Sequence, residues 1–388
     1  MIRKILGPPG TGKTTRLIKY VKTFVKLGTP IDKIGYFAFT KKAAEEAVDR
    51  MLDAYPKLQK KNLKYFKTLH SLAFTRLGLK KSEVMQDEHY EDIGRQLGIE
   101  VTVYSNGQEK TGFVDSDSEY FNLINAARIK NVTIEEEYNT DMYSEDIDKH
   151  MLQILKDEVD NYKYSYKLVD FTDMIEKFNV AKLCPKYDVI FVDEAQDLSP
   201  IQWKMYDILK KNSKHVILAG DDDQAIYGWA GADVDRFINE PATEKVLSRS
   251  RRIPRAVQDI SEIITARIEG LRATKNYLPR DEEGLCSKIN SLENVDLHQD
   301  NWLILTRTLS RAKEVCDLLK VKGLYYENRH QKSYNTKLYK AIVNHNKWLN
   351  GETITDTARA DIIEYLGNRE LIKDRMNYNL KWFECFDN

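Results

Sequence analysis

Residues 7–14 read Gly7-Pro8-Pro9-Gly10-Thr11-Gly12-Lys13-Thr14, and this stretch decides the fold. Its spacing is that of a phosphate-binding loop, whose glycines let backbone N–H groups point at phosphate oxygens ahead of a helix N-terminus. Lys13 then brings a mobile positive charge to the β- and γ-phosphates, and the Thr14 hydroxyl is a ligand for Mg²⁺. We therefore predict a nucleotide site formed by Gly7, Pro8, Pro9, Gly10, Thr11, Gly12, Lys13, Thr14 and Thr15.

The flanks of this loop fit the same prediction. Ile2 to Leu6 can form a short buried strand, and Thr15 to Phe24 carries apolar residues at helical spacing. An ordinary glycine-rich turn is disfavoured because all eight positions and both flanks agree. Strand, loop and helix thus follow one another in the order that nucleotide binding requires.

Further short apolar runs alternate with helical patterns along the chain. A helix is predicted over Lys41 to Met51, where Ala44 and Ala47 share an apolar stripe. Each apolar run predicts a strand buried on both faces, and the runs are Tyr36 to Phe39, Val189 to Val192, Val216 to Ala219 and Trp302 to Leu305. This alternation predicts an α/β fold with a parallel sheet.

The composition bounds the class of protein. At 388 residues, with 42% hydrophobic and 31% charged residues, the chain suits two or three globular domains. The formal net charge is zero, so any contact with nucleic acid must come from a local groove. No window approaches the ~18 to 20 apolar residues of a membrane span, so no membrane partner is expected. The four cysteines are far apart, which favours a reduced cytoplasmic setting; they are Cys184, Cys286, Cys316 and Cys385.

Changes in sequence texture predict five segments. Residues 78–166 are rich in charged residues and tyrosines and contain no apolar run of the kind that predicts a buried strand. They are therefore predicted to form a mostly helical insertion. The insertion separates the two parts of a first α/β domain, 1–77 and 167–253. A new unit begins at 254 and extends to 330, and 331–388 is again helical and polar.

Two carboxylates follow one of the predicted strands. Asp193 and Glu194 come directly after Val189 to Val192, at the strand end where open α/β sheets place ligands. There Asp193 would hold Mg²⁺, and Glu194 would orient or deprotonate the water that attacks the γ-phosphate. The alternative is that these residues only cap the next helix.

A neutral amide follows the next apolar run. Gln224 lies beyond Val216 to Ala219 and is suited to donate a hydrogen bond to a γ-phosphate oxygen or to the attacking water. It loses that partner when phosphate leaves, as a nucleotide sensor does. The alternative is an acidic surface turn, Asp221 to Asp223, and on its own the motif leaves the two interpretations even.

These motifs together resemble the superfamily 1 helicases of UvrD/Rep/PcrA type. The segments 193–202 and 220–232 are especially close to the second and third motifs of that family. Segments 39–44, 68–73 and 169–174 resemble further family segments. The resemblance implies a P-loop NTPase with a RecA-like sheet domain, a helical insertion and a partial second RecA-like domain. It also implies an ATP-dependent DNA helicase that moves 3′ to 5′ on single-stranded DNA.

The resemblance also implies which residues bind DNA and which arginines contact the nucleotide from the segment after residue 250. Unpaired bases would stack on aromatic faces and backbone phosphates would meet polar side chains, and the residues concerned are Phe39, Thr40, Lys41, Thr68, His70, Tyr227 and Trp229. For a lone aromatic the alternative is core packing. Arg252 takes the place of the arginine finger, and Arg251 stands where the family has a tyrosine stacked on adenine. The alternative for both arginines is a solvated basic surface.

The sequence also departs from the family pattern. Only six residues precede Gly7, where the family carries a glutamine-containing segment that reads adenine, so the preference for ATP over other triphosphates is left open. No Lys-Gly-Leu-Glu or Thr-Arg motif follows 331, and this second absence predicts a truncated chain that binds nucleotide but hydrolyses and unwinds poorly. A hydrolysis-impaired, ATP-gated DNA-binding module is therefore the alternative function. Gln196, Gln224 and Trp229 argue against a ring-forming remodelling ATPase, and nothing marks the acceptor pocket of a small-molecule kinase.

Overall fold

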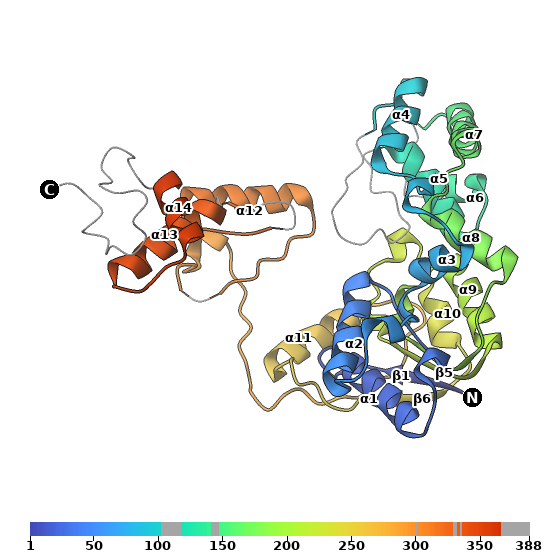
Figure 1. Cartoon of the computed structure of the whole chain (residues 1–388), viewed down its shortest axis with the longest axis horizontal. Coiled ribbons are helices and arrows are strands. Elements are labelled where there is room, and N and C mark those ends of the chain that lie inside the picture. Colours follow the sequence, from blue (N-terminus) through green and yellow to red (C-terminus); the bar gives the residue numbers. More distant parts are fainter. Residues whose placement is uncertain (102–117, 141–146, 300, 329–331, 334–335, 366–388) are drawn as a thin grey trace. The chain divides into compact units, whose positions relative to one another are not determined.

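The computed structural model describes residues 1–101, 118–140, 147–299, 301–328, 332–333 and 336–365 (Figure 1). The chain divides into two compact units, Met1–Cys286 and Ser287–Asn388. The division falls after the boundary expected at 253/254, which stays a prediction.

The first unit is built on a sheet of six parallel strands. The strands are β1 (Ile2–Leu6), β2 (Ile34–Ala38), β3 (Phe66–Thr68), β4 (Tyr187–Val192), β5 (Ser213–Gly220) and β6 (Thr243–Val246). Their order across the sheet is β3-β2-β4-β5-β1-β6, and every pairing is parallel. The crossover connections of such a sheet carry helices, which cover both of its faces.

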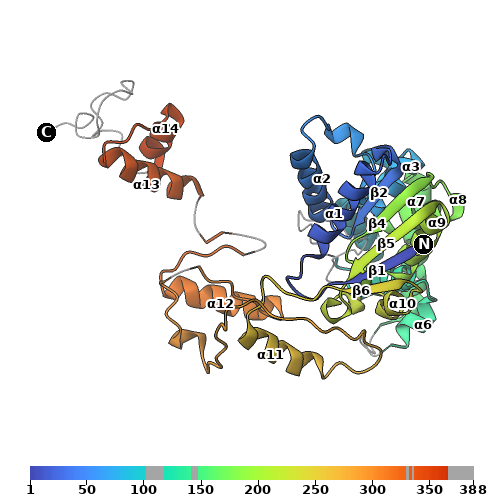
Figure 2. The ribbon, with the colours of Figure 1, turned by 90° about the horizontal axis from the view of Figure 1, so that it is seen from below.

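Helices lie on both faces of the sheet (Figure 2). One face is covered by α1 (Lys13–Lys26) and α2 (Lys41–Ala54), and the other by α3 (Leu69–Leu77), α8 (Phe171–Ala181), α9 (Pro200–Lys211) and α10 (Val234–Asn239). Successive strand residues alternate between the two cores: Phe191 packs under α1 and α2, whereas Val192 packs in the core with α8 and α9. Because both faces are buried, the strands appear in the sequence as continuous apolar runs.

The predicted helical insertion is helical in its described part. It contains α4 (Asp87–Leu97), α5 (Glu119–Lys130), α6 (Ile134–Tyr138) and α7 (Lys149–Tyr166). These helices form a core of their own around Ile93, Phe121 and Leu155. Arg128 of α5 joins them to the sheet domain, since its guanidinium lies 2.6 Å from a carboxylate oxygen of Asp170 at the start of α8. Burial lowers the pKa of Arg128, but the neighbouring carboxylates raise it by more, so the pKa lies above its ordinary value.

The first unit ends in a segment that follows β6. It contains α11 (Arg255–Thr265) and then irregular chain up to Cys286. The segment returns to the sheet edge, where Ser250 N–H donates to the carbonyl of Leu278 at 2.8 Å. Lys275 of this segment makes ion pairs with Asp221 and Asp222, which follow β5, so this part of the segment lies beside the end of that strand.

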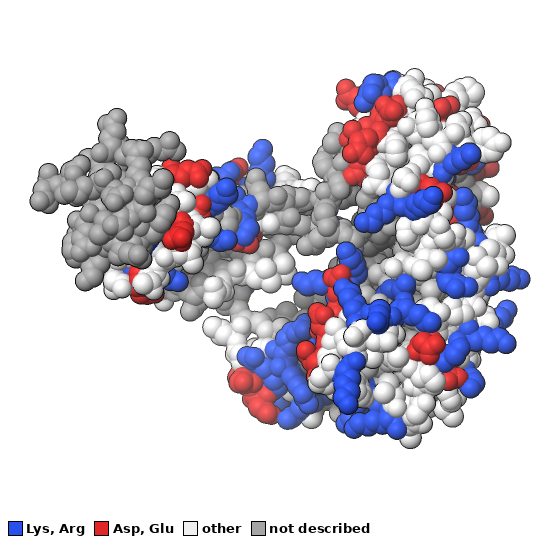
Figure 3. Space-filling model, in the orientation of Figure 1, with Lys and Arg blue, Asp and Glu red and all other residues white. Residues whose placement is uncertain are grey.

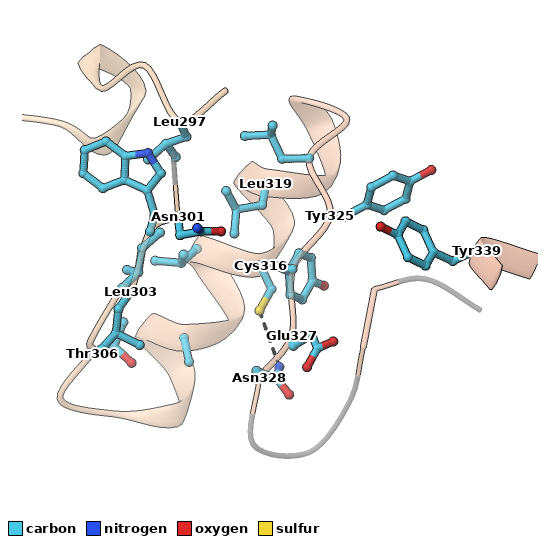
Figure 4. Close-up of a pocket in the computed structure, with 16 residues that line it drawn as sticks. Leu297, Asn301, Leu303, Thr306, Cys316, Leu319, Tyr325, Glu327, Asn328 and Tyr339 are labelled. Carbon is cyan, nitrogen blue, oxygen red and sulfur yellow. Dashed lines mark hydrogen bonds between the residues drawn. The ribbon is translucent and has the colours of Figure 1, made fainter. Parts of the chain in front are cut away.

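The second unit contains α12 (Leu309–Val321), α13 (Thr336–Leu349) and α14 (Asp356–Tyr365). The strand predicted over Trp302 to Leu305 is wrong: this stretch is irregular, and Leu303 and Leu305 are each 83% exposed. The physical reason is that the described residues of this unit offer no strand with which it can pair. Instead the stretch lines one side of a cavity of about 540 Å³ against Cys316 of α12 (Figure 4).

The charged surface, the described helices and the cysteines can each be compared with what the composition predicts. Lys and Arg form several separate groups on the face of the first unit seen in Figure 3, with uncharged surface between them. Among the described helices, none combines the length and apolar character needed to cross a membrane. Cys184, Cys286 and Cys316 are free thiols, and Cys385 lies outside the described residues.

Candidate functional site

The loops that follow the parallel strands meet at one edge of the sheet. Since all strands of the sheet run the same way, the residues after Leu6, Ala38, Val192 and Gly220 share that edge. The backbone N–H of Gly7 donates to the carbonyl of Gly220 at 3.0 Å, which joins the phosphate loop to the end of β5. The predicted phosphate, metal and sensor residues are thus brought together.

The phosphate loop has the backbone that the sequence predicts. Gly10 and Gly12 have φ of 73° and 84°, values at which a Cβ is strained. The Lys13 ammonium donates to the carbonyl of Gly7 at 3.1 Å and lies 3.5 Å from a carboxylate oxygen of Glu194. Lys13 therefore reaches across the loop toward the predicted catalytic carboxylate.

Asp193 is a buried carboxylate at the end of β4. It accepts hydrogen bonds from the hydroxyls of Thr14, at 3.1 Å, and Tyr36, at 2.8 Å. Burial, with the charge of Glu194 second, raises the pKa of Asp193 from 3.8 to about 6. A divalent cation would favour the ionised form, so Thr14 and Asp193 fit Mg²⁺, which takes few protein ligands and completes its shell with phosphate and water. Consistently, no cluster of three or more metal-ligating side chains occurs in the described part of the chain.

Glu194 and Gln196 form a bridge that sequence reasoning missed. Glu194 adopts a left-handed backbone with φ of 52°, unusual outside glycine. The Gln196 amide donates to Glu194 at 3.1 Å and to Asp197 at 3.0 Å, while its carbonyl accepts from the backbone N–H of Asp221 at 3.0 Å. Gln196 thereby ties Glu194, the predicted catalytic carboxylate, to the end of β5. In the sequence Gln196 is only one residue of a motif, and nothing there indicates this bridging role.

The acidic turn beside Gln224 is buried. Asp221 is 0% exposed, so the alternative of a solvated acidic turn is wrong. The Gln224 amide nitrogen donates to an oxygen of Asp221. Lys275, far along the chain, makes ion pairs with all three aspartates 221–223, at 2.6 to 2.9 Å. Nothing in the sequence pattern identified Lys275.

The segment after β6 packs against the phosphate loop. The Ser250 hydroxyl donates to the carbonyl of Pro9 at 2.7 Å, and the backbone N–H of Arg251 donates to the carbonyl of Gly10 at 2.9 Å. The side chains of Arg251 and Arg252 are exposed, and neither has an ion pair within the described residues. Two free guanidiniums thus stand beside a loop built for an anion.

Two of the predicted DNA-binding aromatics touch each other. The rings of Phe39, after β2, and Tyr227 lie with centroids 5.4 Å apart and planes inclined at 38°. Both are half-buried and line a small cavity together with His70 and Asp197. Burial raises the pKa of Asp197 to about 7. The side chain of Trp229 lies outside the described part.

The polar residues predicted to bind DNA have local structural roles as well. The Thr40 and Thr68 hydroxyls accept from the backbone N–H groups of Ala43 and Ser71, capping α2 and α3. Burial lowers the pKa of His70 to about 4, so it is neutral at pH 7 and offers a hydrogen bond but no charge. Lys41 is exposed at the start of α2, where its positive charge is available.

A parallel sheet with a phosphate loop after β1 and an acidic pair after β4 defines a P-loop NTPase of RecA-like fold. The model of the UvrD/REP helicase N-terminal domain matches residues 2–243, and the chain therefore belongs to the UvrD/REP helicase family. The matched range contains the phosphate loop, both carboxylates and the sensor glutamine.

Individual relatives agree with the family match. The chain is 25% identical over 359 residues to a probable DNA helicase of Mycoplasma pneumoniae, covering 86% of this chain and 66% of the relative. It is 26% identical over 246 residues to the putative ATP-dependent DNA helicase YjcD of Bacillus subtilis, covering 59% and 31%. A solved structure, VirB4 of Thermoanaerobacter pseudethanolicus, aligns with a TM-score of 0.25 at 13% identity over 68% of this chain and 79% of the other, too little to support an argument. The chain thus spans two thirds or less of the length of these two curated relatives.

Proposed function

We propose that this chain is an ATP-dependent DNA translocase and helicase. The observation that carries the proposal is the continuous contact path from Lys13 through Glu194 and Gln196 to Asp221. This path links the phosphate loop to the ends of two strands, at the edge where Phe39 and Tyr227 meet. Nucleotide chemistry and an aromatic platform therefore belong to one surface of one domain.

The residues divide the chemistry of hydrolysis between them. The phosphate loop and Lys13 hold the triphosphate, and Glu194 takes a proton from the attacking water. Thr14 and Asp193 would hold Mg²⁺, which would supply positive charge to neutralise the phosphate oxygens. Arg252 steadies charge on the transferring phosphoryl group, and Arg251 stacks on the base.

The DNA contacts follow from the same edge of the sheet. Phe39, Tyr227 and Trp229 offer faces to unpaired bases, at ~1 to 3 kcal/mol per base. Thr40, Thr68 and His70 donate hydrogen bonds to backbone phosphates, and Lys41 neutralises one phosphate. Closure and opening around ATP move the chain 3′ to 5′ along a single strand. The free thiols suit a reduced cytoplasmic setting.

The decisive test is ATP hydrolysis by the 388-residue chain with and without single-stranded DNA. The proposal predicts that single-stranded DNA raises the rate of phosphate release several-fold, with Mg²⁺ required. Labelled duplexes with a 3′ or a 5′ tail then test direction, and only the 3′ tail should support unwinding. Nucleotide and DNA binding without stimulated turnover would instead favour the ATP-gated binding module.

A further inference from the structure

A buried ion cluster holds the loop that carries the sensor glutamine. Lys275 places its ammonium 2.7 Å from Asp221, 2.6 Å from Asp222 and 2.9 Å from Asp223. The Lys275 side chain is only 2% exposed. Burial lowers its pKa, but the three carboxylates outweigh burial and raise the pKa above the ordinary lysine value. The cluster is therefore a charged, desolvated contact, of the kind whose disruption has large effects.

A second cation closes the cluster at its exposed side. The Arg272 guanidinium binds both oxygens of Asp223, at 2.5 and 2.9 Å, and within the described residues it has no hydrogen bond or ion pair with Asp221. The backbone N–H of Ala273 donates to Asp222 at 2.9 Å. Residues 272–275 thus form a strap across the sensor loop, with Lys275 at its buried end and Arg272 at its surface.

Asp221 connects this strap to the sensor side chain. One of its oxygens pairs with Lys275, and the other accepts the amide N–H of Gln224. The backbone N–H of Gln224 also donates to the backbone carbonyl of Asp221, at 3.0 Å. A carboxylate paired with lysine only accepts hydrogen bonds, so it dictates which end of the Gln224 amide faces it. The nitrogen is directed to Asp221, and the carbonyl oxygen has no hydrogen-bond partner among the described residues.

We propose that Lys275 is a positioning residue for hydrolysis: through Asp221 it fixes the Gln224 amide so that its carbonyl oxygen is free to accept a hydrogen bond from the attacking water, whose proton goes to Glu194. The proposal rests on the nucleotide chemistry of the proposed function. Without Lys275, Asp221 would be a buried carboxylate lacking its cation, and it would move or gain a proton. Either change removes the constraint on Gln224 without touching the phosphate loop.

The test compares two ligands of the full chain in the presence of Mg²⁺: ADP, and ADP with aluminium fluoride. The fluoride adduct mimics the transferring phosphoryl group with its water in line, so it reports on water positioning without any turnover. We expect Lys275→Met to weaken the fluoride complex about 10- to 100-fold, the effect of misplacing a group in a pre-organised site. Its affinity for ADP should stay within about twofold of wild type, because the phosphate loop is intact.

Three variants separate positioning from simple support of the fold. Lys275→Arg keeps the charge and should restore most of the discrimination between the two ligands. Arg272→Met removes the neighbouring exposed ion pair and should leave the discrimination unchanged. Adding Lys275→Met to Gln224→Ala should give no further loss, because both act through the same amide. If Lys275→Met does not fold, Asp221→Asn replaces it, since the new amide no longer dictates the orientation of Gln224.

Equal losses for ADP and the fluoride complex, or additive losses in the double variant, would overturn the role of Lys275. The proposed function fails in a different way: wild type would discriminate between the ligands while single-stranded DNA left its ATP turnover unchanged. The two failures are therefore distinguishable on the same protein preparations.

Discussion

Gly10→Ala is the substitution for which the structure gives the clearest expectation. Gly10 has φ of 73°, and a Cβ built there would lie 2.4 Å from the Cβ of Arg252 and 2.6 Å from the Ser250 hydroxyl. It would also lie 3.0 Å from the backbone nitrogen of Arg252, so a side-chain rotation cannot relieve the clash. The phosphate loop and the segment 250–252 must therefore separate.

The cost has two parts. A left-handed backbone costs an L-residue about 1–2 kcal/mol, and forcing extra volume into a packed contact costs about 1–3 kcal/mol more. The sum, about 2–5 kcal/mol, lies below the usual stability of a domain, about 5–15 kcal/mol, so the variant should still fold. Gly28→Ala is the matched control, because Gly28 has φ of 89° with nothing within 4 Å of the built Cβ.

Urea unfolding and the affinity for a fluorescent ADP analogue measure both consequences. The difference in unfolding free energy between the two variants isolates the steric part, about 1–3 kcal/mol. Nucleotide affinity should fall in Gly10→Ala and stay at the wild-type value in Gly28→Ala. Equal destabilisation of the two variants, with nucleotide affinity retained in both, would refute the packing of Arg252 and Ser250 on the loop.

Three further outcomes follow from the same contacts. Because burial raises the pKa of Asp193 from 3.8 to about 6, folding stability is lost as the pH rises through this window. The free energy of unfolding of Asp193→Asn, measured in urea without Mg²⁺, should therefore be higher than that of wild type by up to about 3 kcal/mol at pH 7.5 and by little at pH 3.5. A difference that does not change with pH would contradict this. Phe39→Ala should weaken single-stranded DNA binding by ~1 to 3 kcal/mol, measured by fluorescence anisotropy, with nucleotide affinity unchanged. Lys41→Gln should reduce the salt dependence of DNA binding by about one unit of slope, whereas His70→Gln should leave the slope unchanged because His70 is neutral.

The central strands could be predicted from the sequence, and the edge strands could not. β1, β2, β4 and β5 are each paired on both sides. The buried residues of β2, β4 and the second half of β5 form apolar runs, whereas β1 contains Arg3 and Lys4 and is predicted from its place before the phosphate loop. β3 and β6 are the two edge strands, and the mostly exposed residues of β6 give no such signal. The run at 302–305 is apolar too, but without a neighbouring strand in its described surroundings it remains irregular.

The site residues that belong to contiguous sequence motifs could be predicted. Lys13, Thr14 and Asp193 lie together as the motifs predict. The pairing of Lys275 with Asp221 spans 54 positions along the chain, and a single lysine in a polar stretch has no periodicity to mark it. Tyr36 was interpreted only as a strand residue, because its hydrogen bond to Asp193 depends on the register of β2 against β4. Such contacts depend on tertiary structure.

The most direct test of the account is the hydrolysis of ATP by Glu194→Gln in the presence of Mg²⁺ and single-stranded DNA. The account assigns the removal of a proton from the attacking water to this carboxylate, 3.5 Å from the Lys13 ammonium. It predicts that kcat falls about 10²- to 10⁴-fold while ATP still binds. Hydrolysis at the wild-type rate would contradict it.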